Sequence, residues 1–161
     1  MKKIGFTIGK FAPLHKGHEY LIETALKNMD EFYVVVYDTP QYNIDINTKI
    51  KWIKNRFPKV KILTAFNSPT KYGLDKESVG IQMNFLSNIV KDINVTHFYS
   101  SEEYGKCVAE YMNIENVVVD KERKKYNISA SKIRENIQKE KSYLEDIVYS
   151  DIIKLQDNDV F

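Results

Sequence analysis

The stretch that decides the fold is "KIGFTIGKFAPLHKGH", residues 3–18. Its first part, residues 3–9, is an apolar run containing Ile and Phe, and such runs are typical of a β-strand. Its second part, residues 10–18, places two lysines, a proline, a glycine and two histidines in nine positions. We therefore expect a strand that ends in a tight loop, followed directly by a helix.

The rest of the chain repeats this order of an apolar run followed by a helical pattern. Four further strands are predicted at residues 32–38, 60–66, 95–101 and 116–120. Apolar residues recur at helical spacing within residues 21–29, 46–57, 81–93 and 104–112, and a fifth helix should begin near Ser129. Five successive strand-then-helix units predict an α/β fold with a doubly wound, parallel five-stranded sheet and right-handed crossovers.

The chain length of 161 residues predicts a single domain with a sizeable core. We expect the core to occupy about residues 1–140 and a helical tail to occupy about residues 141–161. The last stretch, "DIIKLQDNDVF", residues 151–161, is expected to be a loosely docked tail.

Charge and hydropathy exclude several classes of function. Lys and Arg number 24 against 22 acidic residues, for a net charge of +2, which disfavours general nucleic-acid binding and requires any basic site to be local. A single cysteine, Cys107, excludes an internal disulfide. No apolar run approaches the roughly 20 residues of a membrane span, and Gly9 and Lys10 interrupt the start too early for a signal peptide. We expect a cytoplasmic protein with no membrane or nucleic-acid partner, and a homo-oligomer is left open.

The first strand-to-helix loop is the candidate site, because ligands of such sheets bind at the carboxyl ends of the strands. Gly9 allows a tight turn and Gly17 opens the helix without a side chain. His15 and His18 are three residues apart, so their imidazoles can face one point. With Lys10 and the N–H groups of the helix start, they suit a polyphosphate. The alternative is that these residues merely cap the helix and turn the chain, which the size of the cluster disfavours.

Two motifs carry a resemblance to a known family. "GKFAPLHKGH" resembles the HxGH signature of nucleotidyltransferases, which join a nucleotide to a phosphorylated acceptor. "ISASKIREN", residues 128–136, resembles the second signature of that family. It offers the hydroxyls of Ser129 and Ser131 at a helix start, and Arg134 for phosphate oxygens. The resemblance implies a Rossmann-like nucleotidyltransferase fold.

A narrower resemblance covers the chain up to about Asn136. "SSEEYG" at residues 100–105, "VVVDKERKKYNISASKIREN" at residues 117–136 and "IKWIKNRF" at residues 50–57 look like the NadR-type nicotinamide mononucleotide adenylyltransferases. The ribosylnicotinamide kinase domain that often follows in that group is not expected here, because the sequence contains no Walker-type phosphate loop.

The resemblance implies a role for each matching residue. His18 would donate to the α-phosphate, His15 would hold the triphosphate, and Lys10 would lie near the reacting phosphates. Mg²⁺ would be held mainly by phosphate and water rather than by protein ligands. The leaving β- and γ-phosphates would be held by Ser129, Ser131 and Arg134. Further nucleotide contacts are expected from Gly9, Phe11, Gly17, Ser101 and Glu102.

The acceptor side departs from the resemblance. Such relatives usually have tryptophans between the third strand and its helix, where this chain has Leu74 and Glu77. Tyr72 or Trp52 could supply an aromatic face instead, although Trp52 suits the core equally well, and Glu77 could pair with a pyridinium ring. The resemblance favours ATP and nicotinamide mononucleotide as substrates, with NAD and pyrophosphate as products.

Three other functions are compatible with parts of this sequence pattern. A cytidylyltransferase acting on a phosphorylated alcohol, sugar or phosphonate would use the same motifs. A fragment of a class I aminoacyl-tRNA synthetase is disfavoured, because 161 nearly neutral residues leave no room to bind tRNA. A non-catalytic nucleotide sensor is disfavoured by the presence of both His18 and Arg134.

Overall fold

The computed structural model describes residues 1–69 and 75–157 of the chain. The strands are β1 (Ile4–Gly9), β2 (Glu31–Tyr37), β3 (Lys61–Ala65), β4 (His97–Ser100) and β5 (Glu115–Val118). The α-helices are α1 (Lys16–Asn28), α2 (Ile46–Arg56), α3 (Lys76–Ile89), α4 (Tyr104–Met112), α5 (Ala130–Glu135) and α6 (Asp146–Asp157). Short 3₁₀ turns lie at η1 (Pro40–Tyr42) and η2 (Lys141–Tyr143).

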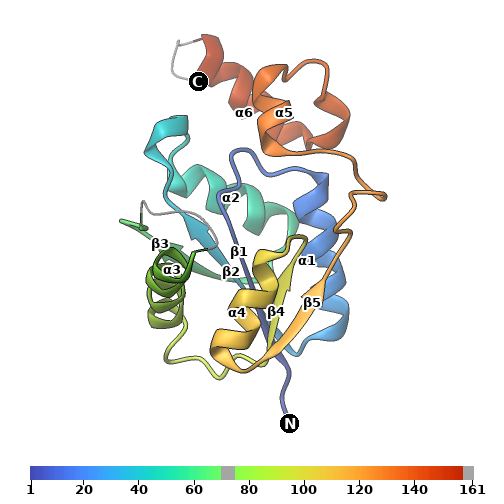
Figure 1. The fold of residues 1–161 in the computed structure, drawn as a ribbon. Coiled ribbons are helices and arrows are strands. Elements are labelled where there is room, and N and C mark those ends of the chain that lie inside the picture. Colours follow the sequence, from blue (N-terminus) through green and yellow to red (C-terminus); the bar gives the residue numbers. More distant parts are fainter. Residues whose placement is uncertain (70–74, 158–161) are drawn as a thin grey trace.

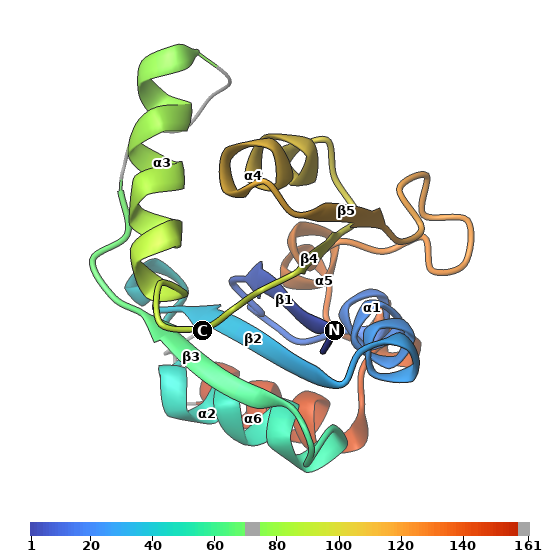
Figure 2. The same ribbon diagram turned by 90° about the horizontal axis from the view of Figure 1, so that it is seen from below.

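The strands form one parallel sheet in the order β3-β2-β1-β4-β5 (Figure 1). Seen along the sheet in Figure 2, α3 and α4 cover one face, and α1, α2 and α6 cover the other. The predicted doubly wound α/β fold with five parallel strands is therefore confirmed. All strands run in one direction, so their carboxyl ends gather at one edge of the sheet.

Side-chain alternation along β2 builds a core on both faces of the sheet. Val34 and Val36 pack into one cluster with α1 and α2, whereas Val35 packs into a second cluster with α3 and α4. All three valines are fully buried. A strand that is apolar on both faces is what a sheet covered by helices on each side requires.

Side chains fix where the helices begin. Asp45 Oδ1 accepts a hydrogen bond from the Asn47 N–H at 2.7 Å at the start of α2. Asp75 Oδ2 accepts one from the Ser78 N–H at 3.0 Å at the start of α3. Such caps satisfy N–H groups that the first helical turn leaves without partners.

The prediction of a loosely docked tail is wrong for the part of the chain that the structure describes. Val148 and Ile152 of α6 are fully buried against the cluster that also holds α2. Trp52 Nε1 of α2 donates a hydrogen bond to Asp151 Oδ2 at 2.8 Å, and Lys51 Nζ lies 2.8 Å from the same oxygen. Apolar burial and a shared carboxylate therefore attach α6 to α2.

A cluster of Arg56 and three glutamates joins α1, α2 and the residue that precedes α6. Arg56 Nε lies 3.2 Å from Glu19 Oε1 and 3.5 Å from Glu145 Oε1, and Arg56 also pairs with Glu23. Glu19 is 4% exposed. Burial, and then the Glu145 carboxylate, raise the pKa of Glu19 to about 8, although Arg56 opposes this shift.

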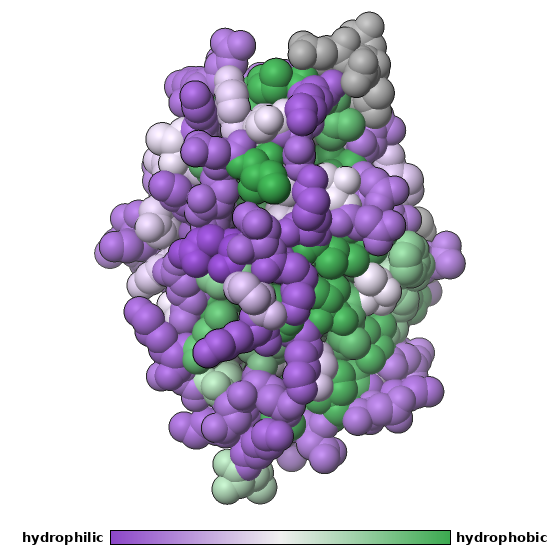
Figure 3. Space-filling model, turned by 180° about the vertical axis from the view of Figure 1, so that it is seen from behind, coloured by the Kyte–Doolittle hydropathy of each residue, from purple (hydrophilic) through white to green (hydrophobic). Residues whose placement is uncertain are grey.

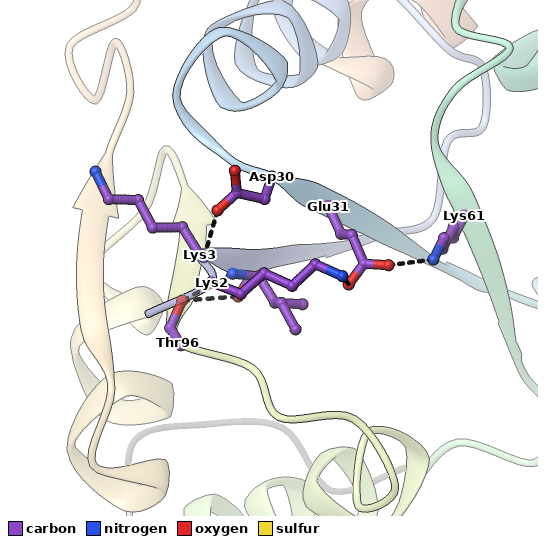
Figure 4. A network of polar contacts seen from close by, with 7 residues as sticks. Lys2, Lys3, Asp30, Glu31, Lys61 and Thr96 are labelled. Carbon is purple, nitrogen blue, oxygen red and sulfur yellow. Dashed lines mark hydrogen bonds and ion pairs between the residues drawn. The ribbon is translucent and has the colours of Figure 1, made fainter.

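A second polar network lies at the amino-terminal edge of the sheet (Figure 4). The Lys3 N–H donates to Asp30 Oδ2 at 2.7 Å, and Glu31 pairs with both Lys2 and Lys61. Thr96 Oγ1 accepts from the Ile4 N–H at 2.9 Å. These contacts hold the strands together at the end opposite to their carboxyl ends.

Hydrophilic side chains cover most of the face shown in Figure 3, with a hydrophobic area near its centre. In residues 1–69 and 75–157, none of the helices combines the length and the apolar composition needed to cross a membrane.

Candidate active site

A cavity of about 610 Å³ opens at the carboxyl ends of the strands. The order of the sheet reverses beside β1, which has β2 on one side and β4 on the other, and ligands of open α/β sheets bind at such a point. All of the residues that the sequence predicted for catalysis and nucleotide binding line this cavity. They are Gly9, Lys10, Phe11, His15, Gly17, His18, Ser101, Glu102, Ser129, Ser131 and Arg134.

The loop after β1 contributes Lys10 and Phe11 to the lining of the cavity. Phe11 has a φ of 48°, in the left-handed region that non-glycine residues seldom adopt. Its buried ring meets the His18 ring edge-on, with 4.8 Å between centroids. A Cβ at Gly9 would lie 2.8 Å from Phe11 Cζ, so only glycine at position 9 leaves room for this ring.

His15 and His18 cap helix α1 reciprocally. His15 Nδ1 accepts a hydrogen bond from the Gly17 N–H at 3.0 Å, and His18 Nδ1 accepts one from the His15 N–H at 3.2 Å. Two histidines thus form the capping box that Ser and Glu usually form. The rings stack with centroids 3.7 Å apart and planes at 21°.

These caps determine the tautomer of both histidines. Because each Nδ1 accepts a hydrogen bond, each neutral ring carries its proton on Nε2. Burial, followed by the positive charge of Arg123, lowers the pKa of His15 to about 4. Burial, then His15 and then Arg123, lower the pKa of His18 well below its ordinary value. Near neutral pH the pair therefore consists of two uncharged imidazoles with fixed N–H donors.

Helix α5 brings the second motif to the same cavity. Ser129 is the N-cap, and its Oγ accepts from the Lys132 N–H at 3.3 Å. Arg134 donates from Nη1 to the Ala12 carbonyl oxygen at 2.7 Å, and its guanidinium carbon lies 4.0 Å from the centroid of the Tyr42 ring. The arginine therefore ties α5 to the first loop, so that the two motifs form one site.

Arg123 is a cavity residue that sequence reasoning missed. It lies in the β5–α5 loop, lines the cavity and donates to the Ile128 carbonyl oxygen. Asp120 shapes this loop, because its carboxylate accepts from the N–H groups of Lys125 and Tyr126. The run of basic residues after the fifth predicted strand was a signal that could have identified Arg123.

Neither of the two predicted acceptor residues that the structure describes, Trp52 and Glu77, lines the cavity. Trp52 is 1% exposed, and its indole is hydrogen-bonded to Asp151 of α6. It therefore cannot contact a ligand in the cavity. Glu77 is exposed on the first turn of α3 and does not line the cavity. Tyr72 and Leu74 lie outside the described residues. The aromatic side chains that β2, α3 and α4 contribute to the lining are instead Tyr37, Phe85 and Tyr104.

The donor set of the cavity suits a metal that arrives with phosphates. Within residues 1–69 and 75–157, no three His, Cys, Asp or Glu side chains are grouped closely enough to hold a metal ion. The Asp120 carboxylate, which lines the cavity, already accepts hydrogen bonds from its own loop. Mg²⁺ readily keeps several waters and binds through substrate phosphates, so these residues fit a metal held mainly by a triphosphate.

A family comparison matches the part of the chain that contains both motifs. Residues 6–136 match the family described as Cytidylyltransferase-like, and the chain belongs to this family of nucleotidyltransferases. The family resemblance inferred from the sequence is therefore confirmed.

Two relatives of different kinds match most of this chain. The trifunctional NAD biosynthesis/regulator protein NadR of Salmonella typhimurium is 34% identical over 154 residues, which cover 84% of this chain and 37% of NadR. This chain thus spans little more than a third of that relative. The phosphopantetheine adenylyltransferase of Streptococcus pyogenes serotype M2 is 27% identical over 165 residues, covering 95% of this chain and 93% of that protein.

Solved structures share the fold. A crystal structure of a NadR protein in complex with NAD and AMP-PNP superimposes with a TM-score of 0.65 at 21% identity, covering 91% of this chain and 46% of that one. A bifunctional NMN adenylyltransferase/ADP ribose pyrophosphatase from Francisella tularensis, complexed with AMP and a manganese ion, gives a TM-score of 0.62 at 15% identity, covering 98% of this chain and 54% of that one. At these identities the likeness shows the architecture alone.

Proposed function

We propose that this protein transfers the adenylyl group of ATP to nicotinamide mononucleotide, yielding NAD and pyrophosphate. The observation that carries the proposal is the pair of Nε2–H donors on His15 and His18, which share one cavity with the guanidinium groups of Arg123 and Arg134. Preorganised donors and cations of this kind are what a reaction at a phosphate needs. The similarity to NadR supports nicotinamide mononucleotide as the acceptor.

In the proposed reaction, a phosphate oxygen of the acceptor attacks the α-phosphorus of ATP in line. The bond from the α-phosphorus to the bridging oxygen breaks, and pyrophosphate leaves with the electron pair. His18 donates its Nε2–H to an α-phosphate oxygen as negative charge develops. His15 and Lys10 hold the triphosphate, and Arg134, with the Ser129 and Ser131 hydroxyls, holds the leaving pyrophosphate. A divalent cation, when bound, supplies further charge neutralisation on the phosphates.

Phosphopantetheine is the second acceptor to consider, because the similarity to the Streptococcus pyogenes enzyme spans nearly the full length of both proteins. A transferase that uses CTP and a phosphorylated alcohol or phosphonate remains the alternative within the family.

The test is a matrix of nucleotides and acceptors with Mg²⁺, followed by pyrophosphate release and product chromatography. ATP with nicotinamide mononucleotide should release pyrophosphate and form NAD in equal amounts. His18→Ala should lower turnover by about 10²-fold, the scale of losing one preorganised donor. The matched control is His97→Ala, because His97 lies at the start of β4 and does not line the cavity.

Two outcomes would overturn the proposal. Orthophosphate as the main product would identify a hydrolase. Faster pyrophosphate release with phosphopantetheine, or with CTP and a phosphorylated alcohol, would assign another acceptor within the same family.

A further inference from the structure

Arg134, the charged residue of the second motif, is held by two groups that lie far from it in the sequence. Its Nη1 donates to the Ala12 carbonyl oxygen at 2.7 Å, and its guanidinium carbon lies 4.0 Å from the centroid of the Tyr42 ring. A cation within about 6 Å of an aromatic centroid is attracted to the ring. Tyr42 and Arg134 are both half-buried and both line the cavity, so this contact lies within the candidate site.

Helix α5 alone does not fix the guanidinium of Arg134. The helix has six residues, and Arg134 lies in its last turn. A long arginine side chain has many rotamers, and ordering such a side chain when a ligand binds reduces the affinity. The Ala12 carbonyl and the Tyr42 ring order it beforehand. Because a guanidinium has five N–H donors, a group held in this way still has donors to turn toward a phosphate.

The position of Tyr42 is itself determined by a buried lysine. Tyr42 ends the 3₁₀ turn η1, where its N–H donates to the Thr39 carbonyl oxygen at 3.0 Å. The ammonium of Lys49, a fully buried residue of α2, donates to the Thr39 hydroxyl and to the Tyr37 carbonyl oxygen, the latter at 2.8 Å. A buried ammonium that lost such partners would be strongly unfavourable. Lys49 therefore joins the end of β2 to η1 and keeps this turn beside the cavity.

We propose that Tyr42 is a positioning residue, whose ring holds the guanidinium of Arg134 in the orientation that receives the β- and γ-phosphates of ATP. This inference rests on the proposed function, which assigns Arg134 to the leaving pyrophosphate. Without the ring, the guanidinium would sample further rotamers in the free protein, and the ligand would have to order it on binding. Loss of the ring should therefore weaken the binding of ATP and of inorganic pyrophosphate.

Calorimetric titration of ATP and of inorganic pyrophosphate, each with Mg²⁺, measures this effect without an acceptor. Tyr42→Leu removes the ring and should raise both Kd values by about threefold to tenfold, the range for one long side chain that must be ordered on binding. Tyr42→Phe keeps an aromatic face and should stay within about twofold of the wild type.

The matched control is Tyr149→Leu, which removes a similar cation–ring contact outside the cavity. Tyr149 packs against the same hydrophobic cluster as Tyr42, and Lys141 Nζ lies 4.8 Å from its ring centroid. Tyr149 does not line the cavity, so this variant should leave both Kd values unchanged. Urea denaturation of each variant checks that the fold is retained.

A double-mutant cycle distinguishes positioning of Arg134 from a direct contact between Tyr42 and the ligand. In the Arg134→Ala background, titrated with ATP up to the millimolar range, Tyr42→Leu should change the Kd by less than about twofold, because the guanidinium through which it acts is gone. An equal effect in both backgrounds would overturn the inference. A wild-type Kd in Tyr42→Leu, or an equal loss in Tyr42→Phe, would overturn it as well.

The same titrations separate failure of this inference from failure of the proposed function. If no NAD forms, but Tyr42→Leu weakens pyrophosphate binding only when Arg134 is present, the positioning role stands and the acceptor assignment falls. If NAD forms and Tyr42→Leu leaves both Kd values unchanged, the inference alone is overturned. A wild type that binds neither ATP nor pyrophosphate would overturn both.

Discussion

The variant Gly17→Ala, which adds one methyl group, should lower catalytic activity and leave the stability of the fold nearly unchanged. A Cβ at this position would lie 2.8 Å from His15 Cε1 and 3.0 Å from His15 Nδ1. To regain an ordinary contact of about 3.5 Å, the imidazole must move by roughly 0.7 Å. The His18 ring is stacked on it at 3.7 Å between centroids, so it is displaced as well.

The expected effects on stability nearly cancel, whereas those on rate do not. Replacing a helical glycine with alanine favours folding by about 0.5–1 kcal/mol, and weakening an N-cap costs about 0.5–2 kcal/mol. A displacement approaching 1 Å in the groups that align a reaction can cost about 10²-fold in rate. We therefore expect Gly17→Ala to lower kcat/KM by about 10–100-fold and to change the free energy of unfolding by less than about 1.5 kcal/mol.

Pyrophosphate release and urea denaturation measure the two effects on the same preparation. The matched control is Gly80→Ala, because Gly80 lies in α3 and a Cβ there meets no atom within 4 Å. The control should keep full activity and gain about 0.5–1 kcal/mol of stability. Wild-type activity in Gly17→Ala would refute the argument that this contact aligns the histidines, as would an equal loss of activity in the control.

Two further predictions concern Arg134 and Glu19. Arg134→Ala should lower kcat/KM for ATP by about 10–100-fold, since a hydrogen bond to a charged group contributes about 1.5–3 kcal/mol; Arg134→Lys should recover part of this, because lysine keeps the charge but not the planar fork. Unchanged kinetics in both variants would show that Arg134 does not contact ATP. The pKa of Glu19 is raised to about 8 in the folded protein, so the native state holds a proton that the unfolded state releases. Stability should then fall by up to about 1.4 kcal/mol per pH unit as the pH rises from about 5 to 8. Urea denaturation across this range should show a flatter profile for Glu19→Gln, and parallel profiles would contradict the assignment.

Most of the fold could be predicted from local patterns, because each strand and helix carries its own periodicity and the β-then-α order limits the topology. The docking of the C-terminal helix could not be predicted in the same way. Val148 and Ile152 do repeat at helical spacing, but the cluster that buries them includes α2, nearly a hundred residues earlier. Apolar periodicity shows that a face will be buried without showing what buries it.

In the candidate site, too, residues within a local motif could be predicted and residues brought together only by the fold could not. The histidine pair and the serines at the start of α5 lie within short motifs, so the sequence alone predicted that these residues share one site. The aromatic lining residues Tyr37, Phe85 and Tyr104 belong to no motif, because β2, α3 and α4 each contribute one of them. Of the two places that the sequence left open for Trp52, acceptor contact and core, the structure shows the core, where its indole is buried and hydrogen-bonded to Asp151.

The reciprocal cap has a consequence for contact with transition metals. An imidazole coordinates a metal through a nitrogen that has a lone pair and no proton. In His15 and His18 that nitrogen is Nδ1, which already accepts a backbone N–H, while the Nε2 turned away from the cap carries the proton. Coordination of zinc or nickel would require each ring to give up its cap and exchange tautomers. The histidines are therefore kept in a form that resists capture by such ions.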